Sequence, residues 1–350
     1  MSALTELLIP PDSSIRKAME CIDRNARGIA IVAHDDRRLI GTLTDGDIRR
    51  AILAGVDLAL PVGQVLHGRA APFTAPIGTP DAQLLRLMTE NGVRHIPLLD
   101  ESERIAAVAQ LSDLIKEYEL PLTAVVMAGG LGMRLRPLTQ DVPKPMLPVG
   151  DRPLLELIVD QLRQAGIRRV NMATHYKGEI IAQHFGNGHG FGVEIVYVTE
   201  DQPLGTAGAL TLVEASDDPI LVINGDILTR LDVRSMLEFH REHGADMTVA
   251  VKLQEFQLPY GVVEIKGTDV VGISEKPKIQ HFINAGVYLL RSSLCRLIPA
   301  NQSYDMPDLI RRVLSDGGRV VSFPVHEYWL DIGQVDDYSQ AKNDRAVGRW

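Results

Sequence analysis

The stretch AVVMAGGLGMRLRPLTQDVPKPMLPVG, residues 124–150, decides how the larger, C-terminal part of the chain is interpreted. Its short apolar run ends in Gly129, Gly130 and Gly132, and glycines after a strand let backbone N–H groups approach phosphate oxygens. Arg134 and Lys144 follow and can meet phosphate charge, arginine with a planar fork and lysine as a point charge. The dinucleotide pattern GxGxxG and the Walker pattern GxxxxGK[ST] are both absent, so the loop belongs to neither of those classes.

The regions that follow this loop alternate between strand and helix patterns. Residues 154–165 carry apolar side chains at helical spacing and end at Gly166, which is a helix stop signal. Such alternation predicts a mostly parallel sheet with helices on both faces. The later strands lie closer together along the chain, so part of the sheet should be antiparallel. The expected strands are residues 124–128, 170–174, 193–198, 220–224, 247–251, 261–265, 270–274 and 285–290.

The whole stretch resembles the signature of the sugar-1-phosphate nucleotidyltransferases, also called nucleoside-diphosphate-sugar pyrophosphorylases. That signature is GGxGxRLxPxT followed by PKP, and this chain has GGLGMRLRPLT and then PKP. Further segments match the family in order and extend the resemblance over residues 122–337: 202–207, 224–226, 260–263, 275–277, 284–286 and 329–333. The resemblance implies an α/β fold with a Rossmann-like, GT-A-like mixed sheet that is mostly parallel.

The resemblance also implies a role for each matching residue. Arg134, Lys144 and Lys276 would be the catalytic cations, and Asp226 and Asp331 would hold Mg²⁺, which prefers carboxylate and phosphate oxygens. The residues implied in nucleotide binding are Ala128, Gly129, Gly130, Gly132, Gln202, Gly205 and Thr206. Those implied in sugar binding are Gly261, Glu275, Asn284 and Gly286.

The implied reaction joins a sugar 1-phosphate to the α-phosphate of a nucleoside triphosphate and releases pyrophosphate. A phosphomonoester with a second pKa near ~6 is largely dianionic at neutral pH and needs no general base to attack. Catalysis then consists of positioning and charge neutralisation, which agrees with the lack of a Ser/His/Asp or Cys/His constellation.

The N-terminal part contains a repeat that resembles a tandem pair of CBS domains, also called a Bateman module. Residues 27–53 and 91–115 share an apolar run, a charged turn, a second apolar run and a step into a helix. The family pattern GxxTxxD is complete in the first copy at Gly41, Thr44 and Asp47, whereas the second copy keeps only Asp113. The resemblance makes Thr44, Asp47 and Asp113 candidate contacts for an adenine nucleotide. A purely structural or dimerising role is the alternative.

Pro121 separates the two patterns, because proline restricts the residue before it. We therefore expect an α+β tandem CBS domain over residues 1–118 and a nucleotidyltransferase catalytic domain over residues 122–350. A net charge of −9 argues against a nucleic-acid polymer as partner, and no apolar run reaches the ~18 residues of a membrane span. The two cysteines are far apart and indicate no disulfide framework or zinc site. These features predict a cytoplasmic protein that does not act at a membrane, and we expect a homo-oligomer.

The sequence leaves the base and the sugar open. A CBS pair ahead of a transferase is similar to bacterial guanylyltransferases of surface-sugar polysaccharide pathways, which favours GTP. A thymidylyl- or uridylyltransferase is the first alternative. The second alternative is a non-catalytic, nucleotide-sensing regulatory protein, which the intact Arg134, Lys144, Asp226 and Asp331 argue against.

Overall fold

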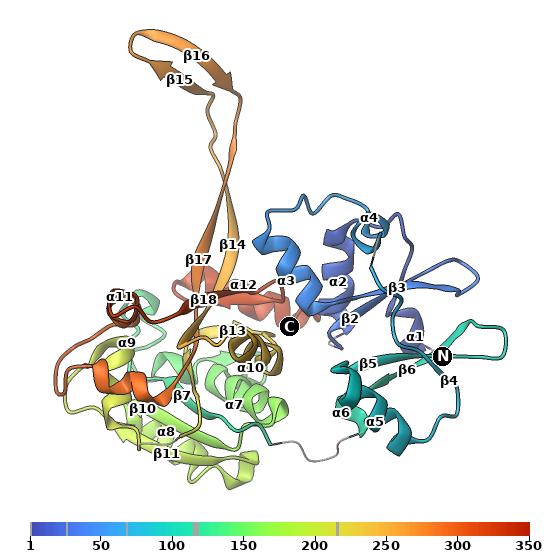
Figure 1. The fold of residues 1–350 in the computed structure, drawn as a ribbon. Coiled ribbons are helices and arrows are strands. Elements are labelled where there is room, and N and C mark those ends of the chain that lie inside the picture. The colour runs from blue at the N-terminus through green and yellow to red at the C-terminus, as the bar shows by residue number, and fades with distance from the viewer. Residues whose placement is uncertain (1, 26, 68, 115–118, 215–216) are drawn as a thin grey trace.

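The computed structural model describes residues 2–25, 27–67, 69–114, 119–214 and 217–350. The predicted end of the N-terminal module near Tyr118 lies outside these residues. Figure 1 shows two small sheets of the N-terminal part beside a larger C-terminal part, from which a two-stranded ribbon projects. Among the described residues, no helix is long and apolar enough to cross a membrane.

The two N-terminal sheets have the same topology. In each, the first strand pairs in parallel with the second and the second pairs antiparallel with the third. Each sheet also has a register shift at the same place, between Val32 and Ala33 in one and between Leu98 and Leu99 in the other. The strands are β1 (Leu8–Ile9), β2 (Ile29–Ala33), β3 (Leu39–Thr44), β4 (Ala75–Pro76), β5 (His95–Leu99) and β6 (Ile105–Gln110). The helices are α1 (Ser2–Thr5), α2 (Ile15–Asn25), α3 (Asp45–Leu53), α4 (Val62–Leu66), α5 (Asp81–Asn91) and α6 (Leu111–Leu114).

Strand β2 shows why one copy of the repeat needs the other. Ala30 and Val32 pack with the apolar face of α2, whereas Ile29 and Ile31 point to the opposite side and pack with Ile105 of the second copy. A strand places successive side chains on opposite faces, so a strand that is apolar on both faces needs a second layer. The structure therefore confirms the predicted pairing of the two copies.

The C-terminal part is built on a seven-stranded sheet in the order β11-β10-β7-β12-β17-β14-β18. Strands β11, β10, β7 and β12 run parallel, β17 lies antiparallel between β12 and β14, and β18 is parallel to β14. This arrangement confirms the predicted mixed, mostly parallel sheet. The strands are β7 (Thr123–Met127), β10 (Arg169–Thr174), β11 (Glu194–Thr199), β12 (Ile220–Asn224), β14 (Met247–Gln257), β17 (Lys278–Leu290) and β18 (Val320–Pro324).

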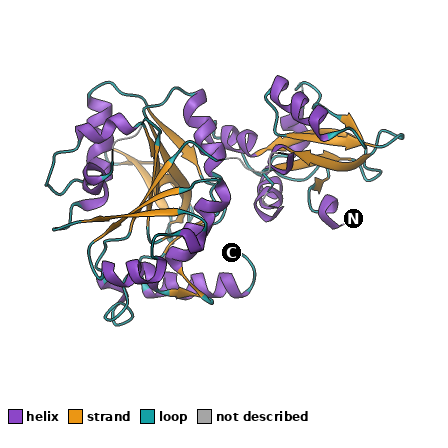
Figure 2. Ribbon diagram, turned by 90° about the horizontal axis from the view of Figure 1, so that it is seen from below, coloured by secondary structure: helices purple, strands orange, loops and turns teal. Residues whose placement is uncertain are grey.

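Helices cover both faces of this sheet, as Figure 2 shows. Alternate residues along β7 belong to different cores: Ala124 and Val126 pack into one apolar cluster and Val125 into the other. The first cluster takes residues from α7 (Leu154–Ala165), α8 (Gly178–Phe185), α10 (Val233–Glu242) and α12 (Val335–Ala346). The second takes residues from α9 (Gly205–Gly208) and α11 (Met306–Ser315).

Shorter elements border the sheet and carry much of the candidate site. Two-stranded pairs are formed by β8 (Pro148–Val149) with β9 (Arg152–Pro153) and by β13 (Ile227–Thr229) with β19 (Trp329–Asp331). The 3₁₀ helices are η1 (Met133–Leu135), η2 (Lys144–Met146), η3 (His189–Phe191), η4 (Ala209–Leu212) and η5 (Ser292–Leu297).

The projecting ribbon is longer than the sequence patterns predicted. Strand β14 continues to Gln257 rather than ending at Val251, and β17 begins at Lys278 rather than at Ala285. Beyond the sheet their side chains are largely exposed, so no apolar alternation marked these extensions as strand. A hairpin of β15 (Val262–Lys266) and β16 (Asp269–Ser274) forms the end of the ribbon (Figure 1).

Candidate active site

The glycine-rich loop leaves the sheet at the carboxyl ends of two parallel neighbours, β7 and β12. Asn224 of β12 pairs with Met127 of β7, and the N–H of Gly225 donates to the Met127 carbonyl at 2.9 Å. A Cβ on Gly225 would lie 2.7 Å from that carbonyl oxygen, which explains the glycine. Open α/β sheets bind ligands beyond the carboxyl ends of their strands. The candidate site therefore lies where the fold favours a ligand.

Gly132 sets the path of the loop toward its cations. Its φ is +61°, a left-handed conformation that glycine adopts without strain. A Cβ there would lie 2.9 Å from Thr139 Cγ2 and 3.1 Å from Lys144 Cβ. The Thr139 hydroxyl donates to the Gly132 carbonyl at 2.8 Å. The loop is thus packed directly against the segment that carries Lys144.

Two carboxylates and two cations meet beside this loop. Lys144 Nζ donates to Asp226 Oδ2 at 2.6 Å, and the lysine side chain is only 10% exposed. Asp226 directly precedes β13, and antiparallel pairing of β13 with β19 places Ile227 opposite Asp331, so the two aspartates lie at the same end of this strand pair. Arg134 Nη1 and Asp331 Oδ1 both lie 3.7 Å from the position that a Cβ on Gly333 would occupy. The structure brings together four side chains from three segments of the sequence: the loop with Arg134 and Lys144, the turn with Asp226 and the strand with Asp331.

Burial and a neighbouring carboxylate both change the pKa of Asp331. Packing around its carboxyl group and the nearby Asp226 charge raise the pKa of Asp331 above its ordinary value, although Lys144 and Arg134 act in the opposite direction. Two adjacent carboxylates supply the hard oxygen ligands that Mg²⁺ and similar cations prefer. A buried, unpaired polar atom, Asn224 Oδ1, lies two residues before Asp226. The residues present therefore fit a divalent metal ion.

The implied base-binding residues line the same edge of the sheet. The N–H of Ala128 donates to the Ala173 carbonyl, and Gly129 packs on Glu200 and His175. Gly205 has a φ of +79° and precedes Thr206, which is tied to Asp305 at the start of α11. The Gln202 side chain donates to the Asn301 carbonyl at 3.1 Å. Gly130 and Gly132 complete the loop between these segments and Arg134.

Glu200 is a residue of this region that the sequence analysis did not single out. It is 8% exposed, accepts a hydrogen bond from the Leu204 N–H at 2.8 Å and lies beside Gly129. Its carboxylate thus connects the glycine-rich loop to the segment before Gly205. An acidic residue directly after an apolar strand was the signal available in the sequence.

The structure separates the implied sugar-binding residues into two groups. Asn284 and Gly286 lie near the sheet, and a Cβ on Gly286 would approach Asn224 Nδ2 to 2.9 Å. Gly261, Glu275 and Lys276 are instead exposed at the outer part of the ribbon, next to its terminal hairpin. The second group is therefore not brought to the four charged side chains by this chain's own fold.

Thr44 and Asp47, two of the predicted ligand residues of the CBS pair, lie at the start of α3. Thr44 and Asp47 form a reciprocal cap of this helix, and Asp47 also pairs with Arg50 and Arg69 at 2.7 Å each. Burial alone would raise the pKa of Asp47, but its hydrogen bonds with Thr44 and the nearby arginines hold that pKa below its ordinary value. Asp113 is exposed on α6 of the other copy.

A buried ion-pair network joins α3 to the C-terminal part. Arg49 is 1% exposed, and its guanidinium donates to Asp45 at 2.7 Å and to Glu327 at 2.6 Å. The Pro324 carbonyl also accepts from Arg49, and His326 contacts Asp45. Asp45, His326 and Glu327 form the one metal-like group of three found within the described residues, but Arg49 already supplies the cation there.

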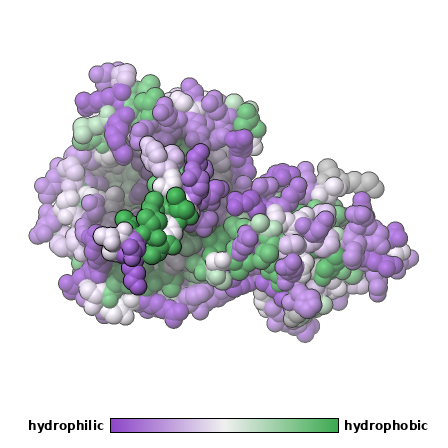
Figure 3. Space-filling view, turned by 90° about the horizontal axis from the view of Figure 1, so that it is seen from above, coloured by the Kyte–Doolittle hydropathy of each residue, from purple (hydrophilic) through white to green (hydrophobic). Residues whose placement is uncertain are grey.

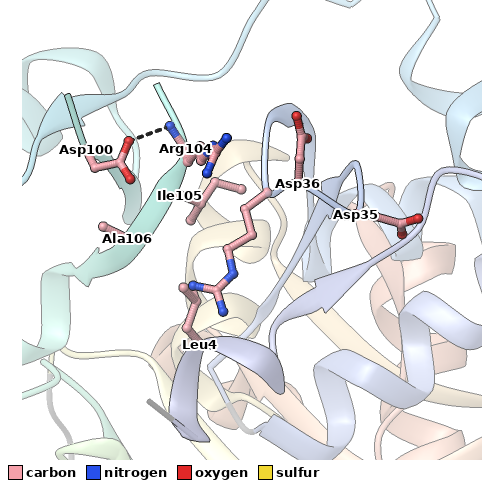
Figure 4. Close-up of a pocket in the computed structure, with 8 residues that line it drawn as sticks. Leu4, Asp35, Asp36, Asp100, Arg104, Ile105 and Ala106 are labelled. Carbon is pink, nitrogen blue, oxygen red and sulfur yellow. Dashed lines mark hydrogen bonds between the residues drawn. The ribbon is translucent and has the colours of Figure 1, made fainter. Parts of the chain in front are cut away.

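Among the described residues, a larger and a smaller cavity border the N-terminal module. The larger, about 1000 Å³, lies between the module and the C-terminal part and is lined by Thr44, Asp45, Arg94, Arg230 and Trp350 among others. The smaller, about 490 Å³, lies between the charged turns of the two copies. Figure 4 shows it lined by acidic and basic side chains together, with a hydrogen bond between Asp100 and Arg104. None of the predicted site residues lines the smaller cavity.

The fold and these sites agree with the comparisons to known proteins. The family model described as nucleotidyl transferase matches residues 123–347, and the CBS domain model matches residues 5–54 and 62–120. The chain belongs to the nucleotidyl transferase family and carries a pair of CBS domains ahead of the transferase domain. Members of this family typically use a divalent metal ion. The resemblance drawn from the sequence motifs is thereby confirmed.

Several relatives are named for related reactions. The chain is 35% identical over 234 residues to a mannose-1-phosphate guanylyltransferase of Mycobacterium tuberculosis, covering 64% of this chain and 65% of that protein. It is 34% identical over 229 residues to a D-glycero-alpha-D-manno-heptose 1-phosphate guanylyltransferase of Aneurinibacillus thermoaerophilus, covering 64% of this chain and 98% of that protein. A solved structure titled as a putative glucose-1-phosphate thymidylyltransferase from Bacillus anthracis aligns with a TM-score of 0.52 and 26% identity, covering 65% of this chain and 95% of that one.

Proposed function

We propose that this protein transfers a nucleotidyl group from a nucleoside triphosphate to a sugar 1-phosphate, with release of pyrophosphate and formation of a nucleoside-diphosphate sugar. The observation that carries the proposal is the convergence of Arg134, Lys144, Asp226 and Asp331 beside a glycine-rich loop at the carboxyl edge of the sheet. The relatives named above support the same reaction class.

In this reaction a phosphate oxygen of the sugar 1-phosphate forms a bond to the α-phosphorus of the triphosphate. The bond from that phosphorus to the oxygen bridging to the β-phosphate breaks, and pyrophosphate leaves with the electron pair. Arg134 lies at the surface of the loop, where it can contact the triphosphate and neutralise charge at the reacting phosphorus. Lys144 is held at 2.6 Å from Asp226 and can act near the α-phosphate.

Asp226 and Asp331 would hold Mg²⁺, and the bound cation would supply neutralisation of phosphate charge. The Lys144 ammonium pairs with Asp226 and neutralises part of the charge of the two carboxylates. Backbone groups of Ala128 and Gly129, with Gln202 and Gly205, would contact the base. Asn284 and Gly286 would contact the sugar, together with Gly261, Glu275 and Lys276 once these reach the site.

We favour GTP as the nucleotide because two of the relatives above are guanylyltransferases. A uridylyltransferase of Synechocystis that is 33% identical over 241 residues supports the alternative of another base. The deciding experiment is a pyrophosphate-release screen of ATP, CTP, GTP, UTP and dTTP against mannose, glucose and heptose 1-phosphates. If no pair of nucleotide and sugar 1-phosphate released pyrophosphate, the proposal would be contradicted and a nucleotide-sensing role would be favoured.

We propose in addition that residues 1–118 form a regulatory domain and residues 122–350 the catalytic domain, in a cytoplasmic protein. An adenine nucleotide at Thr44 and Asp47 would act on the first turn of α3, the helix that also carries Arg49. Arg49 contacts Glu327, and the strand β19 that ends at Asp331 begins two residues later. Titration of the full-length protein with AMP and ATP tests this, with Thr44→Val as the variant expected to weaken binding.

A further inference from the structure

The ribbon holds the predicted sugar-phosphate residues away from the rest of the site. Strands β14 and β17 pair without a shift from Val251 opposite Asn284 to Gln257 opposite Lys278. Six residues of strand at ~3.3 Å each make Lys278 about 20 Å distant from Asn284. Lys276 and Glu275 lie beyond that end of the ladder. In Figure 1 the ribbon points away from both parts of the molecule.

The end of the ribbon is apolar and exposed. Tyr260 is 75% exposed, Ile273 is 74% exposed, and Ile265, Val270 and Val271 are 60% exposed or more. Figure 3, which looks down from above, shows hydrophobic residues gathered at the front of the molecule where the ribbon projects. An isolated two-stranded hairpin is marginally stable in water, and an exposed apolar patch of this kind marks an interaction surface.

The charged cluster on the body is incomplete for two polyanionic substrates. Its two cationic side chains, Arg134 and Lys144, are assigned to the triphosphate, Asp226 and Asp331 would hold Mg²⁺ there, and Lys144 is paired directly with Asp226. A sugar phosphate that enters beside a triphosphate needs a further positive group close by. Lys276 has the required charge, but it lies at the far end of the ladder.

Bending within one chain does not bring Lys276 back. Two residues of extended chain span at most about 7 Å, so a hinge between Lys276 and Lys278 leaves the lysine backbone about 13 Å or more from Asn284. A return to its own site would require the ladder from Val251 to Gln257 to separate. A second copy of the chain meets the same need with every ladder pair intact.

We propose that two copies of this chain exchange their ribbons, so that Glu275 and Lys276 of each copy complete the sugar-phosphate side of the other copy's active site. The exchange is reciprocal, as in a two-fold dimer, and covers the apolar tip of both hairpins. This inference rests on the proposed nucleotidyltransferase function and assigns the sugar subsite to residues from two chains.

Complementation between two inactive variants tests the exchange. One chain carries Asp226→Asn and the other Lys276→Ala, each with its own affinity tag, and the complex with both tags is purified after co-expression. Each variant alone should lose at least ~100-fold in turnover, because a charged group of the site is removed. With exchange, one site of the mixed complex joins an intact cluster to an intact Lys276, so about half of the wild-type activity per complex returns. Without exchange every chain keeps one fault and activity stays at the level of the variants.

Further measurements make each outcome decisive. A mixed complex of wild type with the double variant Asp226→Asn/Lys276→Ala should be inactive with exchange and half active without it. Arg134→Ala replaces Asp226→Asn if that variant stays active. Ile265→Ser with Ile273→Ser should reduce the mass in light scattering from that of a dimer to the 38.5 kDa monomer.

Three results would each overturn the exchange. The wild type is a monomer, the Lys276→Ala variant alone is active, or the variant with Ile265→Ser and Ile273→Ser remains a dimer. Capture of another protein or of vesicles by a monomeric wild type would assign the apolar tip to that partner instead. A wild type without pyrophosphate release on any substrate pair would instead contradict the proposed function, and the mass measurement would still test the exchange.

Discussion

Replacement of Arg49 by methionine should separate the CBS pair from the transferase domain. The substitution keeps the volume of the side chain approximately but removes the cation between Asp45 and Glu327, which are each 5% exposed. Oxygens of these two carboxylates lie within 4.8 Å of one another. At an effective dielectric constant near 20, their repulsion is about 3 kcal/mol. Removal of one partner of a buried ion pair costs about 3–5 kcal/mol, which agrees with the repulsion estimated for the two carboxylates.

The expected result is a loss of about 3–5 kcal/mol in the coupling between the two parts, without a comparable loss within either. Urea unfolding followed by the fluorescence of Trp329 and Trp350 and by circular dichroism should change from one transition to two. Trp350 lines the cavity between the two parts, and Trp329 follows Tyr328, whose N–H is bound by Asp23 of the module.

Arg50→Met is the matched control. Arg50 is on the same helix, but its side chain is 65% exposed and pairs with Asp47, so its removal should cost less than about 1 kcal/mol. The triple variant Arg49→Met/Asp45→Asn/Glu327→Gln should regain most of the coupling because no buried charge remains unpaired. Equal effects of Arg49→Met and Arg50→Met, or a single unchanged transition, would refute the reasoning.

The remaining predictions concern the site and the pH dependence of stability. Asp226→Asn should abolish metal-dependent turnover, measured by pyrophosphate release, while the melting temperature stays within a few degrees; near-normal turnover would remove Asp226 from the metal site. Gly132→Ala should lower turnover at least ~10-fold because of its positive φ and the close Thr139 side chain; unchanged kinetics would show that the loop tolerates a side chain. Burial lowers the pKa of His240 to about 4 from an unfolded value near 6.5. The contribution of neutral His240 to stability should therefore be complete above pH ~6.5 and fall by up to about 3 kcal/mol as the pH drops to 4, and His240→Asn should remove that part of the pH dependence in urea titrations.

Local patterns in the sequence were sufficient for the repeat and for most of the sheet. The CBS copies were recognisable because each has an apolar run, a charged turn, a second apolar run and a step into a helix, and the helix at residues 154–165 matched its predicted bounds. The full length of the ribbon was missed, because its outer strands are exposed on both faces and lack the alternation that a buried face imposes. Glu200 was missed for a related reason, since its partners come from other loops.

The sequence by itself determined which chemical groups the protein has for phosphate binding: glycines where only a bare backbone fits, two cations after them and two distant aspartates. Such motifs can be recognised in a short stretch of sequence, because the local backbone conformation decides which residue types fit there. Only the tertiary structure decided that Asp226 and Asp331 lie at the same end of the paired strands β13 and β19, that Arg49 joins the CBS pair to Glu327, and that Lys276 lies on the projecting ribbon. Those relations depend on strand pairing, burial of charge and the direction of a ribbon, which are properties of contacts between distant segments.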